Sequence, residues 1–348
     1  MSFKDRINGI RRKLMGRLTK GVGRSYSMPK EGDLKIEDVK NVLIIRPNHR
    51  LGNQLLLTPI VQEVLNTFPN CTVDLFVKGG VAHPVFENYE RVDRIIKLPR
   101  KPFNNLFKYL RSWISVKGKS YDLVINGDKS SSSGRLLTQH AKAKFKIFGE
   151  VTGDIENKYS DYRHISKYPV YNLRRYLELL GFDNHETDMP LLDIKLNAPE
   201  IANGKKILDD LVKNAKKTIC IYTNATGDKC YSEAWWETFY ERLKKEFPDY
   251  NIIEMLPIEN ISKINFKAPH FYSKDIREMG GVLRNVSIFI AADNGVMHLA
   301  SASLVPTVGF FSITKEAVYG PYGNGSLAFN TNHTNIEDWI AGIKNILN

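Results

Sequence analysis

The sequence is poor in cysteine and lacks the spacings that a structural metal or a disulfide framework needs. Its three cysteines, Cys71, Cys220 and Cys230, lie far apart in the chain. Its eight histidines include no H-E-x-x-H or other close-set group. Paired cysteines and close-set histidines are the usual signals of structural zinc and of disulfide-rich secreted domains. Their absence argues against both classes and fits a protein of the reducing cytosol.

Long apolar runs are also missing. No run approaches the roughly 18–20 residues that a helix needs to cross a bilayer, and no signal peptide with an apolar core is visible. At 348 residues the chain is long enough for two domains of ordinary size. We therefore expect a two-domain globular protein without a membrane-spanning helix.

Common nucleotide-binding and hydrolytic motifs are absent as well. There is no G-x-G-x-x-G or Walker motif, which argues against a conventional dehydrogenase or a P-loop enzyme. There is no G-x-S-x-G elbow of a hydrolase and no repeat at solenoid spacing. Function must therefore be sought in loops that match none of these motifs.

Positive charge is concentrated at one end of the chain. The net charge is +12, and residues 1–24 contribute 8 − 1 = +7 of it. Within this segment Phe3, Ile7, Ile10, Leu14 and Leu18 recur at helical spacing. A basic amphipathic helix of this kind is typical of contact with an anionic membrane surface. The alternatives are a solvated basic tail or a helix docked on its own protein; nucleic acid is disfavoured because no aromatic stacking residues are interleaved with the cations.

Strands and helices alternate along the chain, which is typical of parallel sheets covered on both faces. We expect strands at 41–45, 72–77, 92–98, 121–125, 145–149, 218–222, 251–256, 288–292 and 305–311. We expect helices at 54–68, 83–89, 103–116, 172–180, 200–214, 234–247, 276–285 and 337–347. Pro59 predicts a kink or a late start in the first of these helices.

This pattern divides the chain into a basic segment at 1–24, a linker at 25–40, a domain at 41–180, a connection at 181–215 and a second domain at 216–348. The terminal helix at 337–347 could pack back on the first domain. Two α/β halves imply a central cleft, where ligands bind beyond the carboxyl ends of the strands.

The segment 288–311 predicts a βαβ unit with a polar turn, Asp293-Asn294-Gly295, before a helix rich in small residues. The start of such a helix has free N–H groups and a positive dipole, where an anion such as a phosphate can sit. The alternative is an ordinary capped crossover helix with Asp293 or Asn294 as its N-cap.

Three further loops follow expected strands, at 46–53, 126–134 and 223–233. In the last, Thr223, Asn224 and Lys229 could bind a diphosphate, because an ammonium can neutralise charge on a leaving group. Glu259 follows another strand and could accept hydrogen bonds from a ribose. His49 could act as a general base. For each, an ordinary loop residue is the alternative.

With these loops in place, the chain resembles glycosyltransferase family 9, the ADP-heptose:lipopolysaccharide heptosyltransferases, from about residue 41 to the end. The match consists of Val42-Leu43-Ile44-Ile45-Arg46, Leu51-Gly52-Asn53, Thr58-Pro59, Tyr121-Asp122-Leu123-Val124-Ile125, Lys229 before Tyr231, and Asp293-Asn294-Gly295-Val296-Met297-His298-Leu299-Ala300. The last element is close to the family's D-S-G-x-x-H-x-A signature.

The resemblance implies a GT-B fold, in which two Rossmann-like domains face a central cleft, with the acceptor domain first and the donor-binding domain second. It implies inverting sugar transfer from a nucleotide donor, with no metal and no cofactor. It places Asp293, Asn294 and Gly295 at the donor's diphosphate and sugar, Thr223, Asn224 and Lys229 at its phosphates, and Glu259 at its ribose. His298 lies within the signature, where holding the turn by hydrogen bonds is favoured over catalysis.

One departure from the family pattern concerns the general base. Family members usually have Leu-Gly-Asp where this chain has Leu51-Gly52-Asn53, and an amide cannot accept the proton of the acceptor hydroxyl. Either Asn53 orients the acceptor while His49, His83 or Asp128 takes the proton, or transfer is slow or lost.

We therefore expect a cytoplasmic enzyme at the inner membrane that moves a heptose or related sugar from an ADP-type donor onto a lipid-linked lipopolysaccharide-type glycan. Residues 1–24 would contact the anionic membrane surface, and no nucleic acid is involved. The alternatives are a catalytically impaired sugar-nucleotide or glycan-binding protein of the same fold, and an enzyme resembling the UDP-sugar epimerases.

Overall fold

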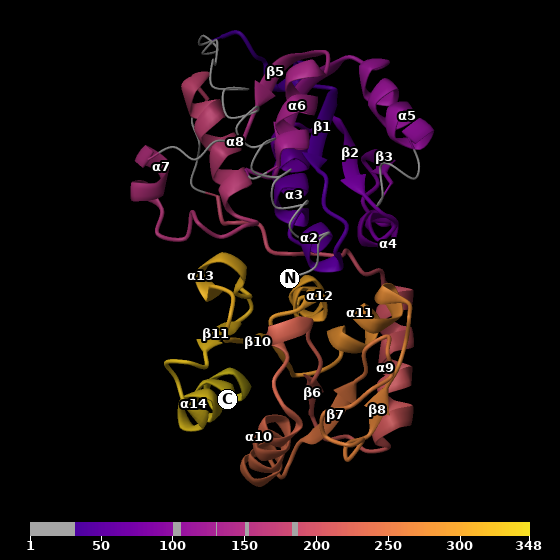
Figure 1. The fold of residues 1–348 in the computed structure, drawn as a ribbon, viewed down its shortest axis with the longest axis vertical. Coiled ribbons are helices and arrows are strands. Elements are labelled where there is room, and N and C mark those ends of the chain that lie inside the picture. Colours follow the sequence, from indigo (N-terminus) through magenta and orange to yellow (C-terminus); the bar gives the residue numbers. More distant parts are fainter. Residues whose placement is uncertain (1–31, 100–105, 130, 150–152, 183–186) are drawn as a thin grey trace, which may run out of the picture.

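The computed structural model describes residues 32–99, 106–129, 131–149, 153–182 and 187–348, which form two α/β domains one above the other (Figure 1). The basic segment expected at 1–24, and residues 25–31 of the expected linker, lie outside these residues. The remainder of that linker belongs to the first domain. Its side chains Leu34 and Val39 are buried in the core on either side of a short 3-10 turn, Ile36–Asp38, because their burial removes apolar surface from water.

The N-terminal domain is built on a five-stranded parallel sheet in the order β3-β2-β1-β4-β5. Alternate residues of β1 point to opposite faces: Val42 and Ile44 meet the core on one side, and Leu43 and Ile45 meet that on the other. The strands are β1 Asn41–Arg46, β2 Thr72–Lys78, β3 Val92–Leu98, β4 Tyr121–Asn126 and β5 Ala143–Ile147. The helices are α2 Leu51–Leu55, α3 Thr58–Thr67, α4 Ala82–Phe86, α5 Leu106–Lys117, α6 Ser132–His140, α7 Gly153–Lys158 and α8 Tyr168–Leu179.

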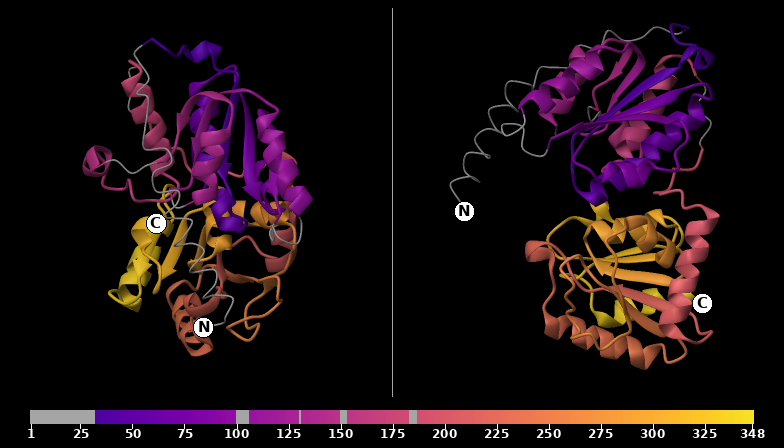
Figure 2. Two further views of the ribbon diagram at one scale, coloured as in Figure 1. Left: turned by 45° about the horizontal axis from the view of Figure 1, so that its top comes forward. Right: turned by 90° about the vertical axis from the view of Figure 1, so that its right-hand side faces the viewer.

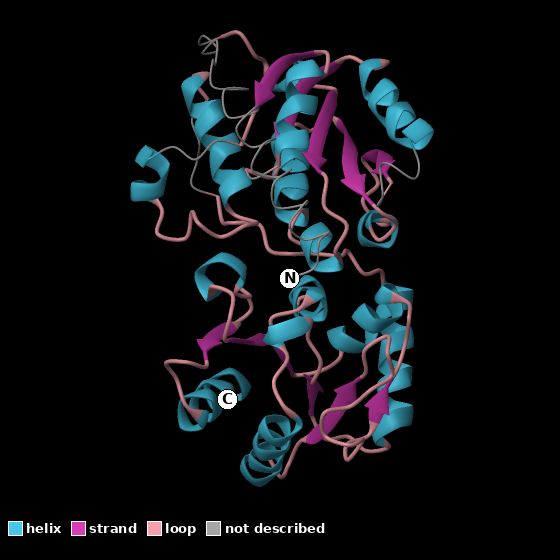
Figure 3. Ribbon diagram, in the orientation of Figure 1, coloured by secondary structure: helices cyan, strands magenta, loops and turns pink. Residues whose placement is uncertain are grey.

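The C-terminal domain has a six-stranded parallel sheet in the order β11-β10-β9-β6-β7-β8, again with helices on both faces (Figure 2; Figure 3). The strands are β6 Thr218–Tyr222, β7 Asn251–Met255, β8 His270–Phe271, β9 Ile288–Ala292, β10 Thr307–Phe311 and β11 Leu327–Asn330. The helices are α9 Ala198–Val212, α10 Glu233–Glu246, α11 Ile276–Arg284, α12 Gly295–Ala302, α13 Glu316–Tyr319 and α14 Ile336–Leu347.

Two expectations about domain organisation need correction. Helix α9, expected in the connection, packs on α11 of the C-terminal domain, where Gly204 and Gly281 bring the two backbones together too closely for a Cβ on either. Among the residues that the structure describes, helix α14 packs on the C-terminal domain, not back on the N-terminal domain. Its Trp339 joins the aromatic cluster around α10, and its Lys344 pairs with Glu246 at 2.6 Å, so burial and charge both hold it on its own domain.

The two domains are joined by polar contacts as well as by the chain. Arg277 of α11 donates to the carbonyl of Pro84 in the N-terminal domain at 2.8 Å. The loop before α8 bonds to the C-terminal domain through Ile165 N–H to Val318 O at 3.0 Å and His164 Nε2 to Gly320 O at 2.9 Å. Helices α2 and α12 pack directly against each other. These contacts bring the carboxyl ends of the two sheets together.

Candidate functional site

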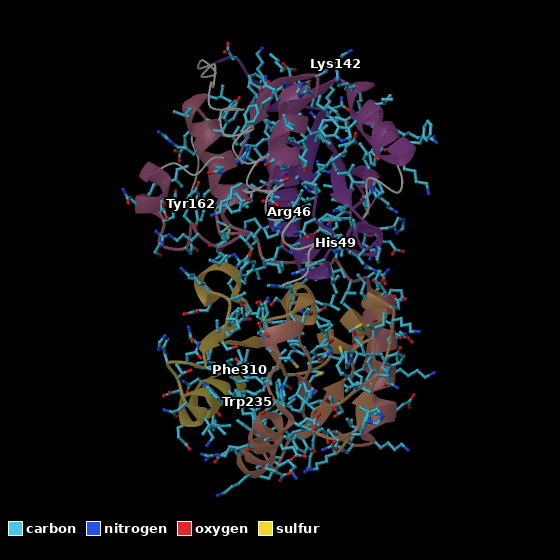
Figure 4. All side chains as sticks on the ribbon, in the orientation of Figure 1. Arg46, His49, Lys142, Tyr162, Trp235 and Phe310 are labelled. Carbon is cyan, nitrogen blue, oxygen red and sulfur yellow. The ribbon has the colours of Figure 1, made fainter. Side chains whose placement is uncertain are left out.

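The loops after β1, β4, β6, β9 and β10 follow the carboxyl ends of the two facing sheets. Residues Arg46 and His49 lie at the edge of the N-terminal domain that faces the C-terminal domain (Figure 4). Because β1 and β4 pair in parallel, with Ile45 beside Asn126, their following loops share this edge. Ligands of parallel α/β sheets bind at such edges. The predicted site residues should therefore lie along this edge.

The centre of the C-terminal half is an ion pair between Lys229 and Asp293. Their Nζ and Oδ2 atoms lie 2.6 Å apart, and the hydroxyl of Thr314 donates to the same carboxylate oxygen. The Asp293 side chain is only 6% exposed, whereas that of Lys229 is 30% exposed. The buried carboxylate of Asp293 therefore fixes the position of the Lys229 ammonium. The ammonium keeps an accessible side and further N–H donors for an anionic group.

Asn294 is the N-cap of α12. Its Oδ1 accepts hydrogen bonds from the backbone N–H groups of Val296 and Met297, both at 2.8 Å, and its Nδ2 donates to Asn224 O at 3.1 Å. The prediction that this helix start offers free N–H groups is therefore wrong for these two, because a side-chain oxygen one turn earlier already satisfies them. The capped-helix alternative is confirmed, and it ties the β6 and β9 loops together.

Gly295 and His298 form the α12 side of its contact with α2. A Cβ on Gly52 would lie 2.7 Å from Cδ2 of His298 and 3.4 Å from the Cα of Gly295, so only glycine allows α2 to lie this close. Burial lowers the pKa of His298; the Asp293 charge opposes this, whereas the charges of Lys229 and Arg46 add to it. The ring is therefore neutral near pH 7. It packs between the domains, while Asn294, not His298, holds the turn.

On the N-terminal side, the predicted residue Asn53 lies beside a buried arginine. Nη2 of Arg46 donates to Oδ1 of Asn53 at 3.3 Å, and Nη1 donates to the carbonyl of Ile165 at 3.4 Å. Arg46 is 1% exposed and its Nε has no hydrogen-bond partner. Across the described ranges no carboxylate forms an ion pair with it. Asn53 thus occupies the position at which a carboxylate would neutralise this cation.

The candidate bases differ in how they are held. Asp128 is half-buried on the loop after β4, and this loop is fixed by Tyr168, whose hydroxyl donates to Gly127 O at 2.7 Å and accepts from Lys129 N at 2.9 Å. His49 and His83 are both exposed. The loop that carries Asp128 is thus held in place at the sheet edge by Tyr168.

Thr223 and Glu259 lie at the carboxyl edge of the C-terminal sheet, but only one faces solvent. The Thr223 hydroxyl donates to Oε1 of buried Glu254 at 2.5 Å and accepts from Lys263 N at 3.0 Å, so it orders the loop that follows β7. Both partners are internal, so the hydroxyl is not presented to a phosphate as predicted. Glu259 is exposed and close enough to Tyr222 for its charge to add to the effect of burial, which raises the pKa of that tyrosine.

Sequence reasoning missed two residues of this arrangement. Arg46 was recognised only as part of a motif, because nothing local shows that an arginine at a strand end will be buried. Thr314 follows β10, at the same sheet edge as the four loops that were selected. The rule that ligands bind beyond the carboxyl ends of parallel strands, applied to this fifth loop, would have found Thr314.

Comparisons with known proteins agree with this architecture. Residues 273–338 match the model of glycosyltransferase family 9 (heptosyltransferase). A family 9 glycosyl transferase from Veillonella parvula superposes with a TM-score of 0.69 at 14% identity, covering 90% of this chain and 98% of that one. The E. coli heptosyltransferase WaaC with ADP gives 0.63 at 17% identity, covering 88% and 99%. No curated protein matches the chain by sequence. The predicted GT-B fold is confirmed, and the predicted family resemblance is confirmed over residues 273–338.

Proposed function

We propose that this chain is a glycosyltransferase, because it has the GT-B fold and because residues 273–338 match the family 9 model. The sugar that it transfers is a heptose or a related sugar, and the nucleotide donor is of the ADP type. The acceptor is a lipid-linked lipopolysaccharide-type glycan, and transfer proceeds with inversion and without a metal, as the resemblance implies. The Lys229–Asp293 pair carries the proposal, because it presents an oriented cation at the edge where the sheets meet.

The donor's diphosphate binds at the accessible side of Lys229. Asp293 and Thr314 hold the lysine in place, and Asn294 fixes the neighbouring backbone by capping α12. Gly295 borders the sugar site, where its lack of a side chain lets α2 lie against the start of α12. Asn224 contacts the phosphates, and Glu259 accepts hydrogen bonds from the ribose. The two α12 amides capped by Asn294 contribute only their dipole.

The acceptor reacts from the N-terminal side. The Asp128 carboxylate removes the proton of the acceptor hydroxyl as its oxygen bonds to the anomeric carbon from the face opposite the leaving group. The bond from that carbon to the β-phosphate oxygen breaks, and the nucleoside diphosphate leaves with its new charge neutralised by Lys229. Asn53, held by Arg46, orients the acceptor.

Two experiments test this function. A thermal-shift screen of nucleotide sugars should single out ADP-heptose, because a ligand at about 100 times its Kd stabilises the folded state by about 2.7 kcal/mol. Asp128→Asn should then lower transfer by about 10²–10⁴-fold without changing donor binding, whereas His49→Gln should leave transfer unchanged. Full transfer by Asp128→Asn would refute the assignment of the base.

The presence of Asn53 supports a second candidate, a catalytically impaired protein that binds sugar nucleotides or glycans. It predicts the same donor-induced thermal shift but no turnover with purified acceptor. Turnover that depends on Asp128 would exclude it.

We further propose that the enzyme works at the cytoplasmic face of the inner membrane, with residues 1–24 as one contact to anionic lipid. In the parts of the chain that the structure describes, no helix combines the length and apolar content needed to span a bilayer. Deleting residues 1–24 should weaken binding to anionic liposomes, and unchanged binding would refute this role.

A further inference from the structure

The outer face of α5 exposes two large apolar side chains. Phe107 is 90% exposed and Ile114 is 67% exposed. They are seven residues apart, two helical turns, and so lie on one side of the helix. Lys108, Arg111 and Lys117 are exposed along the same helix. We call these five residues the α5 face.

The opposite side of α5 is fixed to its domain. Ser112 donates to the carbonyl of Lys97 in β3 at 3.0 Å, Trp113 packs edge-on against Phe76, and Val116 is buried. The helix is therefore held by its inner residues. Phe107 and Ile114 add nothing to this packing, so their exposure calls for a partner outside the domain.

The sequence that leads into and out of α5 is rich in positive charge. From Arg94 to Tyr121 the sequence holds eight lysines and arginines and no aspartate or glutamate. Arg94 and Lys119 pair with Asp74. Within the described ranges the three cations of the α5 face have no ion-pair partner. An anionic partner would supply the missing counter-charge.

We propose that the α5 face docks on an anionic lipid surface. A bilayer interface accepts exposed aromatic and aliphatic side chains, while its phosphates pair with flanking lysine and arginine. The α5 face combines apolar side chains with lysine and arginine side chains on one helix. This helix lies at the outer edge of the N-terminal domain, beyond β3 (Figure 1). This contact is separate from residues 1–24 and does not depend on the transfer reaction.

The position of α5 suits delivery of a membrane-bound acceptor. Strand β3 runs parallel to β2, with Leu98 beside Lys78, so it ends at the same sheet edge as the acceptor-side loops. Helix α5 starts after that end, which places Phe107 toward this edge. Docking through α5 would thus bring the acceptor-side loops near the lipid surface.

Sedimentation of the full-length chain with vesicles of phosphatidylcholine and phosphatidylglycerol in equal amounts tests the charged part. Each cation near an anionic surface strengthens binding about fivefold, so removing three should weaken it about a hundredfold. The variant is Lys108→Gln/Arg111→Gln/Lys117→Gln. The matched control, with the same charge change on exposed lysines of the C-terminal domain, is Lys206→Gln/Lys217→Gln/Lys245→Gln.

The apolar part has its own test. Phe107→Ser/Ile114→Ser should weaken vesicle binding while leaving the unfolding temperature unchanged, because both side chains are exposed. Phe266→Ser, at another exposed aromatic, should not affect binding. The proposal is overturned if the α5 charge variant binds the vesicles as tightly as its control variant does. It is also overturned if the full-length natural chain does not sediment with anionic vesicles. Transfer to a lipid-free acceptor fragment should stay unchanged in the α5 variants, so failure of docking and failure of the proposed reaction are distinguishable.

Discussion

Replacing Asn53 by aspartate would give the buried Arg46 a counter-charge. The guanidinium lies almost wholly out of water, 3.3 Å from Oδ1 of Asn53, and its Nε has no partner. Asparagine and aspartate have the same shape, so Asn53→Asp introduces a charge without disturbing the packing. We therefore expect this substitution to stabilise the fold.

The size of the effect follows from the distance. Two unit charges 3.3 Å apart attract by about 5 kcal/mol at an effective dielectric constant of about 20, and burying the new carboxylate offsets part of this. An adjacent arginine lowers the pKa of an aspartate by about 1–3, which corresponds to about 1.4–4 kcal/mol. We expect a net gain of about 2 kcal/mol. Because the folded-state pKa is depressed, the gain is fully present above about pH 4, the unfolded pKa, and is lost as the pH falls below that value through the lowered folded-state pKa.

Urea unfolding of four proteins measures this gain: the natural chain, Asn53→Asp, Arg46→Met and the double variant. At pH 7 the aspartate should stabilise the natural background, and should not stabilise the Arg46→Met background. An equal effect in both backgrounds would refute the pairing. Transfer should not speed up, because Asp128 supplies the base; a large rate increase would count against Asp128.

Three further predictions concern the cap, the domain contact and pH. Asn294→Ala should lower the free energy of unfolding by about 1 kcal/mol, because it removes the cap of α12. Asn294→Ser should lower it much less, because serine also caps helices. An equal loss of unfolding free energy in the two variants would refute the capping role. Gly52→Ala should destabilise by about 1–3 kcal/mol because its Cβ would meet His298, whereas Gly80→Ala, with nothing within 4 Å, should have no such effect on the unfolding temperature. Burial lowers the pKa of His164 to about 4, so its contribution of about 3 kcal/mol is present above pH 6.5 and is lost as the pH falls toward 4. His164→Gln should flatten the pH dependence of stability in this window, and an unchanged slope would contradict it.

Most of the architecture could be predicted because strong local patterns agree with the tertiary fold. The βαβ unit forms as Ile288–Ala292, Gly295–Ala302 and Thr307–Phe311. Helix α3 starts at Thr58, after a break from α2, with Pro59 in its first turn, as the late-start prediction allowed. Helix α6 was missed, since its Ser-rich start reads as a loop and its N-cap Ser131 is one of several serines. The short strands β8 and β11 have too few residues to show the alternation of apolar and polar side chains that marks a strand.

The site was harder to predict than the fold. The strand-end rule located the loops, but it cannot show which polar groups are already satisfied inside the protein. Thr223 is engaged by Glu254, which is 31 positions away, and burial of Arg46 depends on elements from three parts of the chain. Such pairings arise from tertiary packing, and residue spacing does not encode them.

The central claim, that Lys229 binds the donor's diphosphate, is tested most directly by calorimetric titration with ADP. The double variant Lys229→Met/Asp293→Asn removes the pair without leaving a buried charge, and Lys267→Met/Glu237→Gln removes a more exposed lysine–carboxylate pair elsewhere in the domain. A charge-assisted hydrogen bond contributes about 1.5–3 kcal/mol, so the first variant should bind ADP about 10–100-fold more weakly, and the second as tightly as the natural chain. Equal affinity in all three proteins would contradict the account.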